Sequence, residues 1–234
     1  MKKLAVITAR GGSKRIPKKN ILSFDGQPII AYSIKAALES GVFDEVMVST
    51  DDETIAQIAL QYGAKVPFMR SEKTANDFAG TVDVLFEVLD EYEKRGEKFD
   101  IICCLYPTAP FVTKEKLDKA MKAFEESNAD TLLPVVRYSY PPQRALVAED
   151  NRLKLKYPEH VSSRSQDLEP WYHDAGQFYI MKVDSLRRNK FIIMGDIVPF
   201  ELSELEVQDI DNMTDWEIAE IKYRYMKENA SKEE

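Results

Sequence analysis

Short apolar runs alternate with amphipathic stretches along this 234-residue chain, and this alternation constrains the fold more than any single motif does. Apolar runs typical of buried strands lie at 3–9, 45–50, 100–110, 131–136 and 176–183. Apolar residues at helical spacing lie at 28–41, 52–63, 80–96, 114–128 and 214–229. The stretch 28–41 opens with Pro28, which suits the first turn of a helix, and stops at Gly41. The pattern predicts an α/β fold in which helices flank a mostly parallel central sheet.

One segment, residues 138–172, departs from this alternation. It carries four prolines and one short alternating run, RLKLKY, so we expect a small β-hairpin that leaves the main sheet. A plain surface loop is the other reading, although structureless loops beyond ~15 residues are uncommon in compact domains unless they are functional. We therefore expect residues 1–234 to form a single domain, with 138–172 as an excursion that serves as a dimerisation arm or an active-site cover.

The composition is that of an ordinary folded protein, with 44% apolar and 31% charged residues. No apolar run approaches the ~20 residues that a membrane-spanning helix needs, so we expect no membrane contact. The two cysteines, Cys103 and Cys104, are adjacent in a predicted strand. Neighbouring strand side chains point to opposite faces, so a disulfide between them is not expected. A reduced, cytoplasmic protein is the simplest interpretation.

Positive charge is concentrated near the start of a chain whose net charge is −8. The stretch ITARGGSKRIPKKN, residues 7–20, follows the first predicted strand and contains five Lys or Arg residues. Because the charge is local, it suits a compact anionic ligand better than nucleic acid, which calls for a broad basic face. A solvated basic turn is the alternative. The stretch contains neither the P-loop pattern nor the dinucleotide-binding pattern.

The residue types in this loop suit phosphate. Gly11 and Gly12 let the backbone approach a ligand, and Ser13 adds a hydrogen-bond donor. Cationic side chains here can neutralise phosphate oxygens, and a ligand in an open α/β sheet binds beyond the carboxyl ends of the strands. The residues that we expect to neutralise phosphate are Arg10, Lys14 and Lys19.

Acidic residues elsewhere leave more than one interpretation open. Asp209 and Asp211 lie two apart in a segment that we read as β-like, so both carboxylates face one side and could bind Mg²⁺, or they could form a turn before a helix. Asp51 and Asp52 end a predicted strand, where either a helix cap or a ligand contact is possible. Arg70 could pair with an aspartate or hold a nucleotide, with Asp77 and Thr81 nearby. No hydrolytic triad is readable around His160 or His173.

Four motifs, in this order, carry a resemblance: ITARGGSKRIPKKN, VSTDD, LYPTAPF and DIDN. Together they resemble the cytidylyltransferases that make CMP-activated nonulosonic acids, the family that includes CMP-sialic acid synthetase. The family's first motif is matched by Arg10, Ser13, Lys14, Lys19 and Asn20. Asn20 separates this branch from the similar ketodeoxyoctonate enzymes. The second half resembles the pseudaminic acid branch, because His173 and Tyr106 depart from the residues that sialic acid enzymes typically carry.

The resemblance implies a Rossmann-like nucleotidyltransferase fold and a Mg²⁺-dependent reaction of CTP with a nonulosonic acid that gives a CMP-sugar and pyrophosphate. The residues implied in catalysis are Arg10, Lys14, Lys19 and Asp211, and the metal ligands implied are Asp209 and Asp211. The nucleotide site implied consists of Ala9, Arg10, Gly11, Gly12, Ser13, Lys19, Asn20, Arg70, Asp77 and Thr81. The sugar site implied consists of Tyr106, Thr108, Arg164, Gln166, His173, Gln177 and Tyr179. The resemblance also implies a homodimer in which the excursion reaches the partner's site.

Rival functions remain open at this point. Sialic acid or legionaminic acid could be the sugar instead of pseudaminic acid. A sugar-1-phosphate nucleotidyltransferase would normally carry a loop closer to G-x-G-T-R, which this chain lacks. A nucleotide sensor without turnover would keep the phosphate loop, but retention of both Asp209 and Asp211 argues against it.

Overall fold

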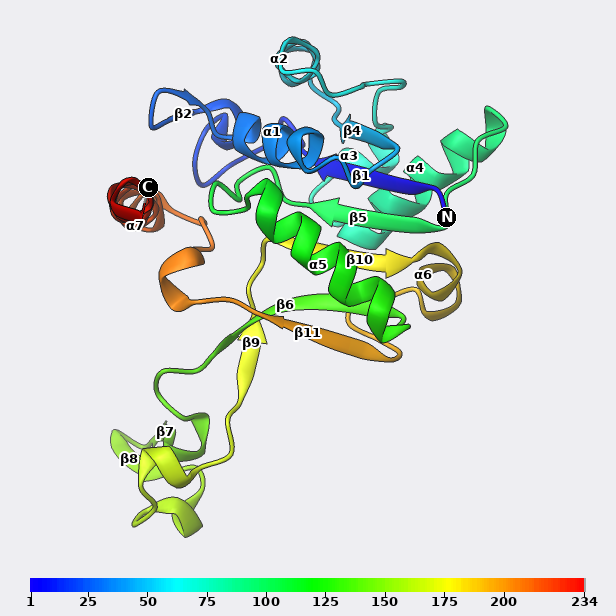
Figure 1. Cartoon of the computed structure of the whole chain (residues 1–234). Helices are drawn as coiled ribbons and strands as arrows, with labels where there is room; N and C mark the ends of the chain where they lie inside the picture. The colour runs from blue at the N-terminus through cyan, green and yellow to red at the C-terminus, as the bar shows by residue number, and fades with distance from the viewer. Residues whose placement is uncertain (234) are drawn as a thin grey trace.

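The fold, seen in a computed structural model that describes residues 1–233, is built on one central sheet (Figure 1). Its helices are α1 Ile30–Ser40, α2 Glu53–Gln61, α3 Glu72–Ala75, α4 Thr81–Lys94, α5 Lys114–Ser127, α6 Val183–Asn189 and α7 Met213–Glu233. Its strands are β1 Lys3–Thr8, β2 Ser23–Phe24, β3 Gln27–Pro28, β4 Glu45–Ser49, β5 Ile101–Leu105, β6 Thr131–Arg137, β7 Leu146–Glu149, β8 Arg152–Leu155, β9 Tyr172–Asp174, β10 Phe178–Lys182 and β11 Ile197–Glu201.

The seven-stranded sheet runs in the order β11-β6-β10-β5-β1-β4, with β9 added at β6. β4, β1 and β5 pair in parallel, as do β11 and β6. β10 lies antiparallel between β5 and β6, and β9 is antiparallel to β6. The sheet is therefore mostly parallel, which confirms the predicted α/β class. The parallel strands β1, β4 and β5 all end at the same edge, where the loops after them meet.

Each face of the sheet carries its own apolar core. Residues of α1, α2 and α5 pack on one face, and residues of α4 and α6 pack on the other (Figure 1). Alternation along β5 sends Cys103 into the first core and Cys104 into the second. Both thiols are buried and free, so the expectation that they form no disulfide is confirmed.

A third, smaller core joins α7 to the loop that follows β1. Phe24 and Trp216 meet edge to face with ring centroids 5.4 Å apart, and Ile16 and Ile210 are buried beside them. This packing matters for the site because it seats the basic loop and the segment before α7 on one apolar base. Within residues 1–233, the structure contains no helix long and apolar enough to cross a membrane.

Local rules explain most helix boundaries, with one exception. Asp52 caps α2 by accepting hydrogen bonds from the backbone N–H of Thr54 and Ile55. Gly41 ends α1 in the left-handed conformation, with φ at 66°. The prediction that Pro28 begins that helix is wrong, because Pro28 pairs with Ser23 in the β2–β3 ribbon and α1 starts two residues later.

Two elements between 183 and 201 were not predicted. α6 is a short helix of seven residues, and β11 is an edge strand that contains Pro199. Proline is tolerated at a sheet edge, where no neighbouring strand requires its missing N–H. The residues of β11 are only partly buried, so the strand lacks the continuous apolar run from which the central strands were predicted.

The hairpin expected within 138–172 is present. β7 and β8 pair antiparallel, with Leu146 opposite Leu155 and Glu149 opposite Arg152. Figure 1 shows that this excursion stands off from the sheet, connected to it through β6 and β9. The chain thus leaves the body of the protein after β6 and re-enters it at β9.

Candidate active site

A cavity of about 430 Å³ lies at the carboxyl edge of the sheet, where the loops after β1 and β5 meet the segment before α7. It is lined by Thr8, Arg10, Ser13, Lys14, Arg15, Ile16, Lys19, Asn20, Thr81, Tyr106, Pro107, Thr108, Asp209 and Asp211. Many of these residues come from the motifs singled out in the sequence. The fold therefore brings together residues separated by about two hundred positions in the chain.

Three of the five cations of the basic loop, defined here as residues 10–20, are paired with carboxylates from distant segments. Asp77 bridges two of them: one oxygen lies 2.8 Å from Arg10 Nη1, and the other contacts Lys14 Nζ. These contacts lower the pKa of Asp77. Arg15 Nη2 lies 2.7 Å from Asp211 Oδ1. The mutual repulsion expected for clustered cations is thus offset within the chain, at positions where an anionic ligand would also be attracted.

Side chains also fix the backbone of the basic loop. Asp51 Oδ1 accepts a hydrogen bond of 2.9 Å from Gly11 N–H, and the buried Asn20 donates its amide to the carbonyl oxygen of Arg10 at 2.9 Å. Of the alternatives left open for the VSTDD motif, the helix cap is confirmed for Asp52. Asp51 has a role that was not predicted, because it holds the backbone of the basic loop.

Gly11 suits its position because the side chain of Asp52 lies close to its backbone. A Cβ atom at this position would lie 2.9 Å from Asp52 Oδ2, a distance that real Cβ atoms essentially never show, and a tight 3.0 Å from Asp52 Cβ. A Cβ atom at Gly12 would meet nothing within 4 Å. The two glycines are therefore not equivalent.

Lys19 connects the loop to the far end of the chain. Its Nζ donates a 2.6 Å hydrogen bond to the carbonyl oxygen of Ile210, the residue between the two aspartates of the DIDN motif. Partial burial lowers the pKa of Lys19, and the charges of Asp209 and Asp211 oppose that shift. The cation is thus held between the basic loop and the acidic pair.

The acidic pair lies in irregular backbone between the short helix at Glu204–Glu206 and α7, so the prediction of a β-like segment is wrong. Both carboxylates nevertheless line the cavity. Burial, followed by the charge of Asp211, raises the pKa of Asp209. Within residues 1–233, no group of three or more His, Cys, Asp or Glu side chains could hold a metal ion. Two hard oxygen donors do fit Mg²⁺, which usually takes one or two carboxylates and completes its shell with substrate phosphates and water.

Arg70 lies beneath a neighbouring cavity of about 250 Å³, whose lining also includes Arg10, Asp77 and Thr81. Its guanidinium is buried, and it donates to the Ser49 hydroxyl at 3.0 Å and to the Ser49 carbonyl oxygen at 2.6 Å. Burial lowers the pKa of Arg70. The position suits the nucleotide contact predicted for it, whereas Asp77 is engaged by the basic loop.

The residues predicted for the sugar are only partly brought together. Tyr106 and Thr108 line the larger cavity, and Tyr179 lies behind Tyr106 with ring centroids 5.6 Å apart. Gln177 is 1% exposed, and its amide donates to the Glu206 carbonyl oxygen, so it ties two backbone segments together. His173 is exposed against Tyr138.

Two further residues predicted for the sugar lie in the excursion. Arg164 precedes the first turn of a short helix there and Gln166 lies within that helix, on the part of the chain that stands away from the sheet (Figure 1). In a single copy of the chain, these two side chains are therefore separated from the cavity.

Four residues of the cavity wall were missed by the sequence analysis of the site: Thr8, Arg15, Ile16 and Pro107. Ile16 is apolar and also belongs to the small core beside α7. Arg15 carries the same charge as its neighbours in the basic motif, so composition alone could have indicated it. Thr8 ends β1 and Pro107 follows Tyr106, and only the shared strand edge could have indicated these positions.

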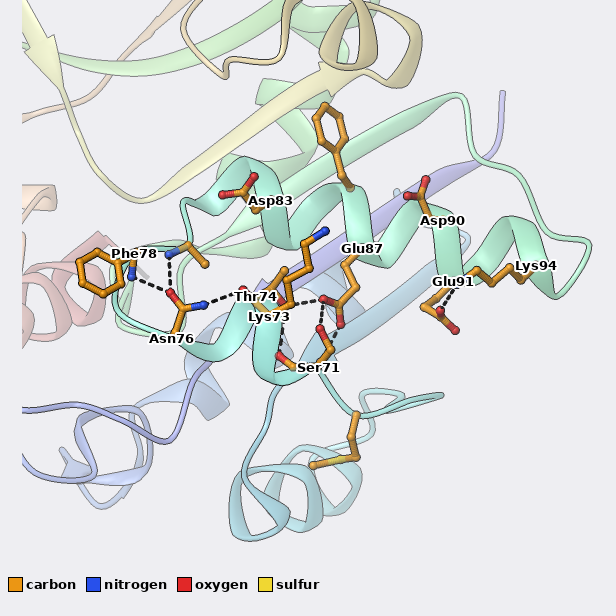
Figure 2. Close-up of a pocket in the computed structure, with 13 residues that line it drawn as sticks. Ser71, Lys73, Thr74, Asn76, Phe78, Asp83, Glu87, Asp90, Glu91 and Lys94 are labelled. Carbon is orange, nitrogen blue, oxygen red and sulfur yellow. Dashed lines mark hydrogen bonds and ion pairs between the residues drawn. The ribbon is translucent and has the colours of Figure 1, made fainter.

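A larger hollow, of about 890 Å³, lies along α3 and α4 (Figure 2). Several of its polar groups are hydrogen-bonded to one another. The Glu87 carboxylate accepts hydrogen bonds from the backbone N–H and hydroxyl of Ser71 and from the hydroxyl of Thr74. Asp83, Asp90 and Glu91 add further negative charge to its wall. This lining disfavours a phosphorylated ligand, so the basic cavity is the candidate active site.

Comparison with known proteins identifies the family. A family model described as cytidylyltransferase matches residues 4–213. The chain belongs to the cytidylyltransferase family. This cytidylyltransferase is 42% identical over 231 residues to the pseudaminic acid cytidylyltransferase of Campylobacter jejuni, covering 98% of this chain and 100% of that protein. It is 35% identical to the CMP-N,N'-diacetyllegionaminic acid synthase of Legionella pneumophila, covering 94% of this chain and 95% of that protein.

A solved structure agrees on the fold. The structure of CMP:2-keto-3-deoxy-manno-octonic acid synthetase complexed with CTP matches this cytidylyltransferase with a TM-score of 0.70 at 19% identity. The match covers 97% of this chain and 100% of that one. The nucleotidyltransferase fold expected from the sequence is thereby confirmed.

The two loop glycines provide a matched pair of variants. We expect Gly11→Ala to weaken CTP binding, because its Cβ displaces the Asp52 side chain and disturbs the backbone that Asp51 holds. Loss of the α2 cap should also lower the free energy of unfolding by about 1 kcal/mol. Gly12→Ala should leave the free energy of unfolding near that of the wild type, because its Cβ meets no protein atom within 4 Å. Calorimetric titration with CTP and chemical denaturation measure both quantities, and equal behaviour of the two variants would contradict this account.

Asp77 provides a second test. In Asp77→Asn the positive charges of Arg10 and Lys14 lose their carboxylate, so we expect inorganic triphosphate to bind more tightly, most clearly at low salt. Glu97→Gln is the matched control, because Glu97 pairs with Lys2, which precedes β1 at the opposite edge of the sheet. Calorimetric titration with triphosphate measures the effect. Weaker binding in Asp77→Asn would show that Asp77 contacts the ligand instead of competing with it.

Proposed function

We propose that this cytidylyltransferase activates a nonulosonic acid, pseudaminic acid, by joining it to CMP from CTP with release of pyrophosphate. The observation that carries the proposal is the cavity that combines the basic loop with the distant acidic pair. Full-length similarity to a pseudaminic acid cytidylyltransferase supports the choice of sugar, since the identity is 42% against 35% for the legionaminic acid enzyme.

The chain's own residues suit this reaction. Arg10, Lys14 and Lys19 would hold the triphosphate of CTP, aided by the backbone amides of residues 11–13. The anomeric hydroxyl of the sugar acid attacks the α-phosphate, a new oxygen–phosphorus bond forms, and the bond to the β-phosphate bridging oxygen breaks. Pyrophosphate leaves, and the hydroxyl proton passes to water. Phosphoryl transfer of this kind depends chiefly on positioning and on charge stabilisation, which the clustered cations provide.

Asp209 and Asp211 would hold Mg²⁺, together with phosphate oxygens of the substrate. A bound Mg²⁺ neutralises phosphate charge and lowers the pKa of a hydroxyl that it contacts. Arg70 and Thr81 would contact the ribose and base from the wall of the adjoining cavity. Asn20 would support the same nucleotide site by holding the backbone of the basic loop. Tyr106 and Thr108 would contact the sugar.

Lys19 is the residue on which to test catalysis. We expect Lys19→Ala to lower the rate of pyrophosphate release about a hundredfold or more, because a cation directed at developing charge is lost. Asp211→Ala should lower it similarly. Lys18→Ala is the matched control, since this neighbouring lysine lies outside the cavity lining and its loss should leave the rate nearly unchanged. Near-normal rates in either of the first two variants would remove the role assigned to that residue.

The sugar itself is decided by a panel of substrates. Purified protein, CTP and Mg²⁺ are incubated with pseudaminic, N,N'-diacetyllegionaminic and N-acetylneuraminic acids, and pyrophosphate release is measured for each. We expect the highest kcat/KM with pseudaminic acid. A higher value with legionaminic acid would assign the chain to that substrate, and no release with any of the three would overturn the proposed activity.

We further propose that the active form is a homodimer joined through the excursion, residues 138–172. The excursion stands off from the body of the protein (Figure 1). It exposes large apolar side chains, and Tyr140, Leu146 and Leu153 are each more than half exposed. Arg164 and Gln166 would then reach the partner's cavity, where an arginine suits the carboxylate of a sugar acid. Two free, buried cysteines and the use of CTP support a cytoplasmic enzyme.

Mixing of variants tests the dimer. Arg164→Ala and Lys19→Ala proteins, each impaired alone, are unfolded together and refolded so that subunits exchange. If Arg164 acts across the interface, mixed dimers contain one complete site, and activity should return to about a quarter of the wild-type value. A mixture that stays as inactive as its components would place Arg164 in the site of its own chain or remove it from the site.

A further inference from the structure

The segment between β11 and α7 brings the acidic pair to the cavity without support from the sheet. The last contact with the sheet is a hydrogen bond from Leu202 N–H to the Val135 carbonyl oxygen. The chain then forms the short helix Glu204–Glu206 and continues as irregular backbone to α7. Within residues 1–233, no backbone–backbone hydrogen bond reaches residues 207–211. The peptide groups on either side of Asp209 must therefore be oriented by contacts with side chains.

Lys222 of α7 makes two of these contacts. Its Nζ donates hydrogen bonds to the carbonyl oxygens of Glu204, at 3.0 Å, and Val207, at 2.8 Å. Carbonyl groups at the end of a helix lack partners within it, and a lysine side chain can supply them. One ammonium group has three protons, so it can serve both carbonyls. Lys222 thus holds the end of the short helix at the point where the irregular backbone begins.

Two lysines hold the chain on either side of Asp209. Lys222 fixes the carbonyl group of Val207, two residues before Asp209. Lys19 fixes the carbonyl group of Ile210, directly after it. The side chains of Val207 and Ile210 are buried in two different small cores. Burial holds a side chain in place, but the rotation of the neighbouring peptide group is left to hydrogen bonds. The peptide group after Val207 sets the direction in which the chain enters Asp209.

We propose that Lys222 is a positioning residue, which fixes the peptide group after Val207 and so holds Asp209 where it can bind one divalent metal ion together with Asp211. Lys222 does not line the cavity, so it acts through the backbone. Mg²⁺ requires nearly ideal geometry, and groups that orient metal ligands contribute to metal affinity. The inference rests on the proposed function for the role of the acidic pair, whereas the two hydrogen bonds of Lys222 are a property of the protein alone.

Lys222→Met removes both hydrogen bonds with little other change. Methionine is unbranched and of similar length, so it keeps the packing of the apolar lysine stem. The ammonium group of Lys222 is partly buried, and this burial lowers its pKa. Removal of a charge that is costly to bury offsets the loss of the hydrogen bonds, so we expect the melting temperature to stay close to that of the wild type.

Lys227→Met is the matched control. Lys227 also lies on α7, and its Nζ is 2.7 Å from Asp25 Oδ2 in the turn between β2 and β3. Each variant therefore removes a lysine contact that joins α7 to another segment. The control contact does not involve the segment that leads to the acidic pair, so general loosening of α7 should appear in both variants and a positioning effect in Lys222→Met alone.

Binding of Mn²⁺ tests the positioning role. Mn²⁺ prefers the same oxygen ligands as Mg²⁺, and EPR spectroscopy measures the free ion during a titration of the protein. The binding that Asp211→Ala abolishes is assigned to the acidic pair. We expect Lys222→Met to weaken this binding about tenfold, a usual loss when a group that orients a metal ligand is removed, and Lys227→Met to leave it unchanged.

The affinity for inorganic tripolyphosphate, measured without metal, should stay at the wild-type value in both lysine variants, because the cations of the basic loop line the cavity and Lys222 does not. The inference is overturned, while the proposed activity stands, if Lys222→Met binds Mn²⁺ as the wild type does or loses tripolyphosphate affinity as well. If Asp211→Ala binds Mn²⁺ as tightly as the wild type, the acidic pair holds no metal, and the metal part of the proposed function falls together with the inference.

The hydrogen bond to Val207 is measured without reference to function. The chain contains a single Val-Gln dipeptide, Val207–Gln208. Protein made with ¹³C-carbonyl valine and ¹⁵N glutamine therefore gives one HNCO signal, from the peptide group that Lys222 holds. We expect this signal to shift in Lys222→Met and to stay in place in Lys227→Met. An unchanged signal in Lys222→Met would show that Lys222 does not hold this carbonyl group and would overturn the inference.

Discussion

The structure depends on the neutralisation of one strongly basic turn. Residues 10–20 gather cations at a strand end, and they are held in place because carboxylates arrive from three other segments. Asp77 meets Arg10 and Lys14, Asp211 meets Arg15, and Asp51 accepts from the loop backbone. Each of these acids belongs to a different connection at the same sheet edge. Attraction between the loop and these acids therefore specifies how the connections converge, as well as how the site is charged.

In this arrangement carboxylates of the protein offset the positive charge of the site, but the cations can still bind an anionic ligand. Surface ion pairs between exposed groups are individually weak, so those on Lys14 and Arg15 can exchange for a multiply charged ligand at little cost. Lys19 differs, because it is half-buried and bonded to a backbone carbonyl that does not leave. The loop thus combines one fixed cation with several that can change partners, which suits a site that must bind a triphosphate and then release pyrophosphate.

The sequence predicted the central strands and the amphipathic helices because continuous apolar runs and helical spacing report burial directly. It missed β11 and α6, where partial burial and short length leave a weak pattern. At the site, residue type and position after a strand selected Arg10 and Lys19 as candidates, whereas Asp211 was selected only together with the family resemblance; all three line the cavity. The sequence did not show whether Gln177 and Tyr179 face the cavity or lie behind its wall. That depends on packing, which no local spacing of residues encodes.

The hydrogen bond from Lys19 to Ile210 joins residues 191 positions apart. During synthesis the basic loop emerges before the carbonyl that fixes its half-buried lysine, which follows only 191 residues later. Until then the loop is a cationic segment without its C-terminal partners, and triphosphate would find only part of its site. The complete site therefore requires that the segment before α7 has docked against the basic loop.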